Sequence, residues 1–485
     1  MTRKAIIGIL ALPALVVLFL AMSWIDGAVV RARLARVDKS LSSKVPFILV
    51  TSRKETGGLF SSTVEVNYEF SSKLFKGMAA ASAKQTAYVA ASTPGSAEST
   101  PNITLRYHIQ HGPIPGFAAL GLARVDTEIV IPEDIKQELR KSIGTDQPLK
   151  IVTLLGYFGG GTTSIDSPAF VYDDKKTATR VDWKGIKGLM HFTRHLDSQD
   201  GNVTLSGMNV KDDKGVEVVL GPIRFDYDMK RAFKYLFAGK ANFTMERMAV
   251  SMPQQQAGPG NMEMRDLVYD VTTTSKGDYL DTVAKIGLGS MSVATLKSAS
   301  VHYDFSLRHI HGPTYAELVE KLRSVYAATF AGDDKAAQQI VVSFKEYGAL
   351  LLEHQPEFTI DRISMSLPEG SAQLSGKVSI PGYVHGDLDS GPMVLLPKIE
   401  VSADVAVDEG FLNRDWGPSS PPAVEPTAGT PTPPSRFEAM KTQLAALEQQ
   451  GFVTRNGSRL SSHIEFKHGA LTVNGKPMGP PGAGR

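Results

Sequence analysis

The sequence contains no cysteine among its 485 residues. A disulfide scaffold, a thiolate metal site and a cysteine nucleophile are therefore all excluded. Neither positive nor negative charge is in large excess, because the chain has 52 basic and 50 acidic side chains and a formal net charge of only +2. A nucleic-acid-binding protein needs a basic surface to pair with phosphate, so we expect no nucleic-acid partner.

Established catalytic motifs are absent as well. The chain has no HExxH, no GxSxG and no dinucleotide fingerprint. The run Gly159–Thr163 could suggest a phosphate cradle, but the lysine of a P-loop is missing and no helical pattern follows, which favours a turn. We therefore predict no catalytic, cofactor-binding or metal-binding residues, and an enzyme would need residues from distant positions.

A long uncharged run is present at the start of the chain. Ala5 to Ile25 contains no charged residue and as a helix would span about 31 Å, close to the thickness of a bilayer core. A cleaved signal peptide is the alternative, but the run exceeds the roughly 7–15 apolar residues of such a peptide. The sequence thus favours an uncleaved single-pass anchor and makes the membrane the first predicted partner.

The sequence gives less direct evidence about which side of the membrane the body of the protein lies on. Basic residues are more numerous after the run than before it, which by simple counting would keep the body cytoplasmic. Long domains are translocated largely regardless of local charge, and the lack of cysteine is compatible with an oxidising compartment, so we predict a body outside the cytoplasm.

An apolar stripe follows the run. Val30, Leu34, Val37 and Leu41 recur at the spacing of one helix face. An interfacial helix resting on anionic headgroups is one interpretation. We favour the other, in which the helix continues and packs this stripe on the body.

The body alternates between two periods. From about residue 45 to 310 apolar and polar residues mostly alternate, as in antiparallel sheets with one buried face. A helical period appears at Pro313–Phe330, with Leu318 and Val325 inward, and in a second helix at 333–354, with Phe344 inward. The fold class is therefore α+β and β-dominated, with elongated, twisted antiparallel sheets and one N-terminal transmembrane helix.

Two similar segments predict a duplication. Asn102–Pro113 and His302–Pro313 both alternate strictly, both end in His-Gly-Pro, and lie 200 positions apart. Both lead into helix-compatible segments, so we predict a duplicated strand-plus-helix module with the two strands in the same phase.

The six residues of these sites are candidate site residues, and we interpret them as structural: His111, Gly112, Pro113, His311, Gly312 and Pro313. The histidines could act as metal ligands or a pH sensor. Against a metal, His108 and His111 point to opposite faces of a strand, and no third ligand is spaced near the second site. A histidine at the edge of the core that bonds to a backbone carbonyl is the favoured interpretation.

Compositional changes divide the chain. The predicted parts are an anchor and juxtamembrane helix at 1–45, a first β-rich repeat at 46–230, a second at 231–416, a Pro-rich linker at 417–435, and a C-terminal helix and β-hairpin at 436–485. Residues 77–101, rich in Ala, Ser and Thr, are predicted to be an insertion.

Several short segments occur in an order that resembles a known family. They are Gly58–Ser62 at the start of a strand, His111–Pro113, Trp183–Gly185 and the closing Gly469–Gly475. With the N-terminal anchor, they resemble the YdgA-like family of bacterial envelope proteins, a domain of unknown function. The resemblance implies an inner-membrane protein of a Gram-negative bacterium with its body in the periplasm, and supplies no catalytic residues.

Two functions are compatible with these features. The first is a non-enzymatic, anchored envelope protein that binds lipid, a partner protein or a second copy of itself, without a cofactor. The alternative is an envelope hydrolase or metal-dependent enzyme built around His111 and His311.

Overall fold

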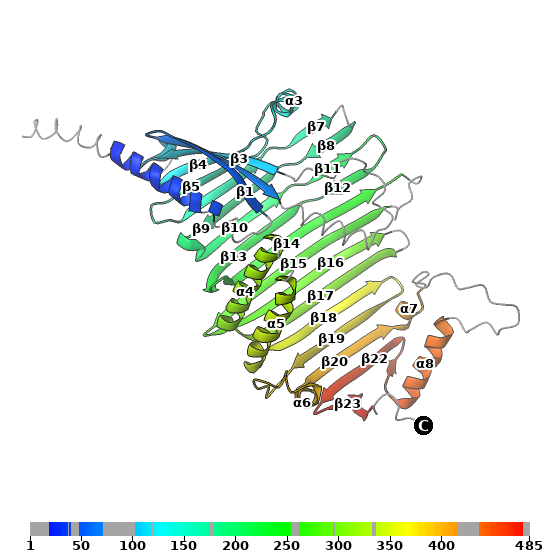
Figure 1. Cartoon of the computed structure of the whole chain (residues 1–485). Helices are drawn as coiled ribbons and strands as arrows, with labels where there is room; N and C mark the ends of the chain where they lie inside the picture. Colours follow the sequence, from blue (N-terminus) through cyan, green and yellow to red (C-terminus); the bar gives the residue numbers. More distant parts are fainter. Residues whose placement is uncertain are drawn as a thin grey trace, which may run out of the picture. The chain divides into compact units, whose positions relative to one another are not determined.

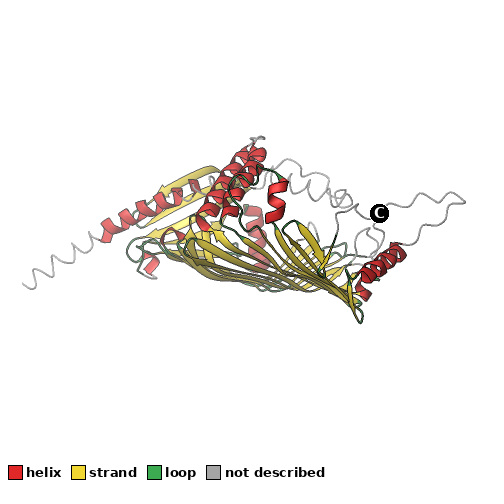
Figure 2. Cartoon of the chain, turned by 90° about the horizontal axis from the view of Figure 1, so that it is seen from below, coloured by secondary structure: helices red, strands yellow, loops and turns green. Residues whose placement is uncertain are grey.

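The structure is a computed structural model, and it describes residues 19–36, 38–39, 48–70, 102–117, 120–174, 178–253, 261–293, 296–331, 336–414 and 436–478. Strands predominate over helices (Figures 1 and 2), which confirms the predicted β-dominated, antiparallel fold class. The chain divides into two compact units. The first comprises residues 1–243, 250–258 and 316–345, and the second comprises residues 244–249, 259–315 and 346–485.

The first unit is built on a series of antiparallel pairings in which each strand bonds to the next in the order β1, β2, β3, β4, β5, β6, β9, β10 and β13. Their bounds are β1 Ile48–Gly57, β2 Ser61–Phe70, β3 Asn102–His111, β4 Ala123–Ile129, β5 Lys150–Leu155, β6 Gly161–Ser167, β9 Ile186–Phe192, β10 Ser198–Leu205 and β13 Ile223–Phe233. A shorter ladder joins β7 (Phe170–Asp174), β8 (Thr179–Trp183), β11 (Met208–Lys211) and β12 (Glu217–Leu220). Helix α3 (Glu133–Ile143) connects β4 to β5, and β14 (Leu236–Ser251) contributes residues to both units.

The core of the first unit follows from the alternation of β2 and β3. Val64 and Val66 on β2 are completely buried, and Ile109 on β3 is 1% exposed. These side chains project from one face of the sheet, since alternate residues of a strand share a face. Val30, from the helical residues 19–36, covers this face and belongs to the same cluster.

The second unit is an antiparallel sheet whose first strands are long and whose last strands are mostly short. Its strands are β15 Met262–Lys276, β16 Tyr279–Val293, β17 Leu296–His311, β18 Glu357–Leu367, β19 Gly370–Ser379, β20 Glu400–Asp408, β21 Thr454–Asn456, β22 Arg459–Lys467, β23 Ala470–Val473 and β24 Lys476–Pro477. Short helices α6 (Pro392–Leu395) and α7 (Glu409–Leu412) flank β20, and α8 (Arg436–Gln450) precedes β21.

Both predicted helices after the second His-Gly-Pro site are confirmed, as α4 (Gly312–Ala331) and α5 (Ala336–Glu353). Leu318 and Val325 are buried as expected. The inward placement of Phe344 is wrong, because its side chain is 52% exposed and the adjacent Ser343 takes the buried position. The small hydroxyl side chain allows close packing where the apolar pattern pointed to phenylalanine.

The predicted C-terminal hairpin is confirmed. Ile464 pairs with Val473 and Phe466 with Leu471. His468 and Gly469, between the strands, have φ of 52° and 76°. Two central residues with positive φ are the signature of a type I′ turn, whose twist matches that of the flanking strands.

Some predictions fall on residues outside those described: most of the anchor (1–18), the insertion (77–101) and the Pro-rich linker (417–435). Among the described residues, no helix combines the length and apolar character needed to cross a membrane.

Candidate functional site

The helical residues 19–36 lie on the sheet of the first unit and attach to it along an apolar stripe. Val30 is fully buried, and Leu34 packs against the same cluster as Val50 and Leu105. The prediction that this stripe packs on the body is confirmed for Val30 and Leu34, while Val37 and Leu41 lie outside the described residues.

Polar contacts continue this attachment in both directions. Near the start of the helix, the Ser23 hydroxyl donates to the backbone carbonyl of His111 over 2.8 Å. Farther on, Arg31 forms an ion pair with Glu55 at 2.9 Å. At the helical residue Asp38, the carboxylate accepts a hydrogen bond from the Tyr68 hydroxyl at 2.8 Å. The helix is therefore fixed in direction relative to the strands.

His111 lies at the centre of this attachment. Its Nδ1 lies 2.8 Å from the carbonyl oxygen of Ser23. Because a carbonyl only accepts, Nδ1 carries the proton, and Nε2 accepts from the Ser62 hydroxyl 3.1 Å away. Arg31 donates to the same hydroxyl oxygen over 2.7 Å. The predicted histidine at the core's edge, bonded to a backbone carbonyl, is confirmed at this site.

Burial shifts the titration of the groups around His111. Removal from water lowers the pKa of His111, so the ring is held neutral, although its bond to Ser23 opposes the shift. Burial also raises the pKa of Asp26, against the opposing effects of a hydrogen bond from Tyr157 and of the neighbouring His111 ring. Desolvation and the adjacent Asp26 carboxylate raise the pKa of Tyr157 to about 12.

Gly112 and Pro113 complete the first motif. Gly112 has φ of 121°, and a Cβ there would lie 2.4 Å from the Ser23 hydroxyl oxygen. Glycine is needed for both the backbone conformation and the close approach of the helix. Pro113 leads into the loop, where its carbonyl accepts from the amide of Gly121 at 3.3 Å.

The second motif has different surroundings. The rings of His311 and His354 stack with centroids 3.7 Å apart, and His311 Nδ1 lies 2.8 Å from the Thr314 hydroxyl. Gly312 begins helix α4 and Pro313 is in its first turn, a position that proline favours. His111 belongs to the first unit and His311 to the second.

The predicted common strand phase is wrong. On β3 the buried residues include Ile109 and His111, whereas on β17 they include Asp304, Ser306 and Ile310, and Phe305 is 36% exposed. The buried face carries polar side chains because partners on β18 satisfy them: Arg362 donates to Asp304, and Ser306 donates to Asp361. This face stays buried on both sides of a bulge at His309, where φ is 58° and the register with β16 shifts. The sequence match therefore does not correspond to equivalent strands, and the duplicated module is not supported.

Four loops of the first unit meet at one edge of its sheet. The register places Ser61 opposite Gln110 and Ala123 opposite both His111 and Leu155. It also places Gly161 opposite Phe192. The loops at this edge, which we call the strand-end edge, comprise residues 58–60, 112–117 with 120–122, 156–160 and 193–197.

Each loop of the strand-end edge exposes large apolar side chains to solvent. Phe158 is 93% and Leu120 is 81% exposed, and the others are Leu59, Phe60, Ile114, Tyr157 and Leu196. The described residues of the first three loops carry no charged side chain. Exposed apolar groups gathered in this way mark an interaction surface more often than scattered ones do.

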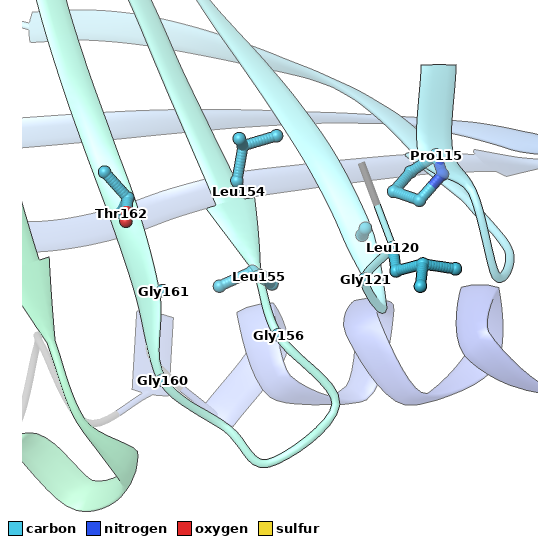
Figure 3. Close-up of a pocket in the computed structure, with 10 residues that line it drawn as sticks. Pro115, Leu120, Gly121, Leu154, Leu155, Gly156, Gly160, Gly161 and Thr162 are labelled. Carbon is cyan, nitrogen blue, oxygen red and sulfur yellow. The ribbon is translucent and has the colours of Figure 1, made fainter. Parts of the chain in front are cut away.

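A pocket of about 310 Å³ opens at the strand-end edge (Figure 3). Its lining is apolar or small and includes no charged residue: Pro115, Leu120, Gly121, Ala123, Leu154, Leu155, Gly156, Gly160, Gly161 and Thr162. The turn predicted at Gly159–Thr163 is confirmed for Gly159 and Gly160, since the amide of Gly156 donates to the carbonyl of Gly160 over 2.8 Å, whereas strand β6 already begins at Gly161. Glycines of this turn form one wall of the pocket.

The site lacks the features of a metal centre. No group of three or more histidine, aspartate or glutamate side chains suited to a metal occurs among the described residues.

The pocket volume is at the lower end of the roughly 300–1,000 Å³ typical of ligand pockets. With an apolar lining and one hydroxyl at Thr162, its chemistry fits a hydrocarbon chain or another small apolar group.

Neither the strand-end edge nor the pocket was predicted from the sequence. The available signal was an unusual pairing of large apolar residues with glycines in loops, as in Gly58-Leu59-Phe60 and Gly156-Tyr157-Phe158-Gly159. Polar residues normally fill such turns, so an apolar pair between glycines indicates a surface that is used.

Comparisons with known proteins give one match. The family model described as a bacterial protein of unknown function (DUF945) matches residues 2–481. No curated protein matches, and no solved structure matches. Because the family model covers nearly the whole chain, the chain belongs to this DUF945 family of bacterial proteins of unknown function.

Proposed function

We propose that the chain is a non-enzymatic protein of the bacterial envelope that binds lipid in the pocket at its strand-end edge. In this proposal the uncharged N-terminal run anchors it in the inner membrane and the body lies in the periplasm, as the YdgA-like resemblance implies. The observation that carries the proposal is the charge-free pocket, flanked by the exposed Leu120.

The position of the pocket supports a hydrocarbon ligand. Leu120 at its mouth would be an unfavourable exposed group unless it met another apolar surface. Lipid tails need no hydrogen-bond partner, and the lining includes no charged side chain that would be left unpaired by their binding.

Photo-crosslinking tests this function directly. The full chain is placed in vesicles that contain a phospholipid with a photoreactive group in its acyl chain, and labelled residues are identified by mass spectrometry. We expect labels at the pocket residues Leu154, Leu155 and Thr162. Thr162→Glu, which puts a carboxylate in the pocket, should remove them, whereas Thr204→Glu on β10 should not. Labels confined to residues 1–25 would contradict lipid binding in the pocket.

A hydrolase is the second candidate, and one observation favours it. The Ser62 hydroxyl lies 3.1 Å from Nε2 of His111, a distance suited to a nucleophile and its base. However, Ser62 is 4% and His111 3% exposed beneath the helix, and the hydroxyl oxygen already accepts from Arg31. A substrate would reach this pair only if the helix moved away.

A serine-reactive fluorophosphonate probe separates the two candidates. We expect no labelling of the native chain. Labelling that is lost in Ser62→Ala would favour the hydrolase. For the metal-dependent version, stoichiometric zinc that disappears in the His111→Ala, His311→Ala double variant would overturn our proposal.

A further inference from the structure

We propose that the strand-end edge of the first unit lies flat on the membrane, with its loop side chains in the lipid interface. This inference rests on the anchored location proposed above and adds a second, peripheral contact between the folded body and the bilayer. Its occupant is the lipid surface itself.

The start of the described helix shows where the chain enters the first unit. Phe19 is close to Phe60, with ring centroids 6.0 Å apart, and Ser23 bonds to His111, so the start of the described helix is at the strand-end edge. Later helix residues contact positions farther along the strands, as Asp38 does with Tyr68. The chain therefore joins the first unit across the strand-end edge.

The uncharged run is only just long enough to cross a bilayer. Ser23 is fully buried against protein, so at most Ala5–Met22, about 18 residues, remain to cross the bilayer. As a helix this segment would measure about 27 Å, slightly less than the roughly 30 Å of a typical hydrocarbon core. No spacer is left between the membrane and the body, which brings the strand-end edge to the lipid surface.

The exposed side chains of the strand-end edge are of the kind that enters a lipid interface. Phe158, Leu120, Phe60 and Leu196 project from four separate loops at exposures of 93%, 81%, 46% and 48%. Aromatic and large aliphatic side chains of this kind enter the headgroup and acyl boundary of a bilayer. Trp24, at 62% exposure near the start of the helix, fits the aromatic belt found at that depth.

The few charges at the strand-end edge are compatible with lipid contact. Among the described residues of its four loops, the charged side chains are Arg194 and Asp197, and His195 is titratable. Asp197 is paired with Arg231 at 3.1 Å. This leaves no excess of acidic groups that anionic headgroups would repel.

The absence of cysteine makes a site-specific test clean. Single variants Phe158→Cys, Leu196→Cys and, as a control, Val171→Cys on β7 are labelled with an environment-sensitive fluorophore in the full chain. Each is reconstituted into phosphatidylethanolamine–phosphatidylglycerol vesicles with or without a spin-labelled lipid. We expect a blue-shifted emission that the spin-labelled lipid quenches at positions 158 and 196, and neither effect at position 171.

A second measurement guards against insertion caused by the fluorophore. With the label at Phe60→Cys, an added Phe158→Glu should reduce the quenching, while an added Val171→Glu should leave it unchanged. Water-like emission at all four labelled positions would overturn the proposal. So would a blue shift that grows with protein density without lipid quenching, because that result indicates contact with a second copy.

Failure of this inference is distinguishable from failure of the proposed function. If the anchor does not exist, alkaline pH will release the chain from the vesicles, whether or not the strand-end edge contacts them. If the pocket binds no lipid, the acyl-chain crosslinks at Thr162 will be missing although positions 158 and 196 are quenched.

Discussion

The imidazole of His111 lies directly against the backbone of Gly27, so closely that a Cβ on Gly27 would be 2.5 Å from Cε1 of the ring. Both nitrogens of that ring have partners, on the helix at Ser23 and on the sheet at Ser62. The glycine therefore allows the helix to approach a histidine that connects it to both β2 and β3.

Gly27→Ala should destabilise the full chain, although alanine is otherwise the better helix former. Overpacking of this kind costs about 1–3 kcal/mol. Gly348→Ala is a matched control, because Gly348 is in helix α5 and has nothing within 4 Å of its Cβ position. We expect the control to be neutral or stabilising by up to about 1 kcal/mol.

Removing the ring should relieve the clash. In a double-mutant cycle read by thermal unfolding, Gly27→Ala combined with His111→Ala should cost less than the sum of the two single changes. Additive costs would show that Gly27 and His111 do not touch.

The two motif glycines should respond differently to the same change. Gly112→Ala combines a positive φ with a Cβ 2.4 Å from the Ser23 hydroxyl oxygen, so we expect a loss of at least about 1–3 kcal/mol. Gly312→Ala lies at the start of helix α4 and should cost little. Chemical denaturation of each variant gives the comparison, and equal losses would restore the case for equivalent sites.

Local pattern in the sequence was enough to predict many elements. The helices after Gly312 and the hairpin at His468-Gly469 depend on neighbouring residues, whose period and turn chemistry can be read directly. The stripe at Val30 and Leu34 was found for the same reason, because one helix face must be buried.

Longer-range features could not be derived in this way. The contact between Ser23 and His111 joins residues 88 positions apart, and nothing in either segment identifies the other. Asp304 and Ser306 are buried because Arg362 and Asp361 on the neighbouring strand hydrogen-bond to them, so the alternation of that segment alone gave the wrong phase. The strand-end edge depends on the register of neighbouring strands, and no single loop predicts it.

His111→Gln should make the chain less sensitive to acid. Unfolded, the histidine takes up a proton as the pH falls through about 6.5, whereas burial keeps the folded ring neutral to a lower pH. Its contribution to stability is therefore present above that pH and is lost on acidification. Glutamine does not titrate, so the variant should cost about 1–3 kcal/mol at neutral pH through its altered hydrogen bonds and lose less on going to pH 5.

Thermal unfolding of both proteins from pH 8 to pH 5 provides this measurement. His108→Gln is a suitable control, because the side chain of His108 is half exposed and outside the buried attachment. An unchanged acid response in His111→Gln would contradict the neutral, buried ring.

Asp26→Asn should stabilise the chain at neutral pH, which is unusual for a change at a residue only 6% exposed. The unfolded carboxyl loses its proton near pH 3.8, but burial raises the folded pKa, so the folded state binds the proton more tightly. The stability that this provides is full below pH 3.8 and is lost as the pH rises through the folded pKa. Asparagine stays neutral and can still accept a hydrogen bond from the Tyr157 hydroxyl. The gain in stability should therefore be present at pH 7 and vanish near pH 4.

Asp38→Asn is a control for which we expect the opposite effect. Asp38 is ion-paired with Arg53, so the loss of its charge should destabilise the chain. Thermal unfolding from pH 4 to pH 7 measures both variants, and a loss of stability at pH 7 in Asp26→Asn would show that the carboxylate is stabilised where it lies.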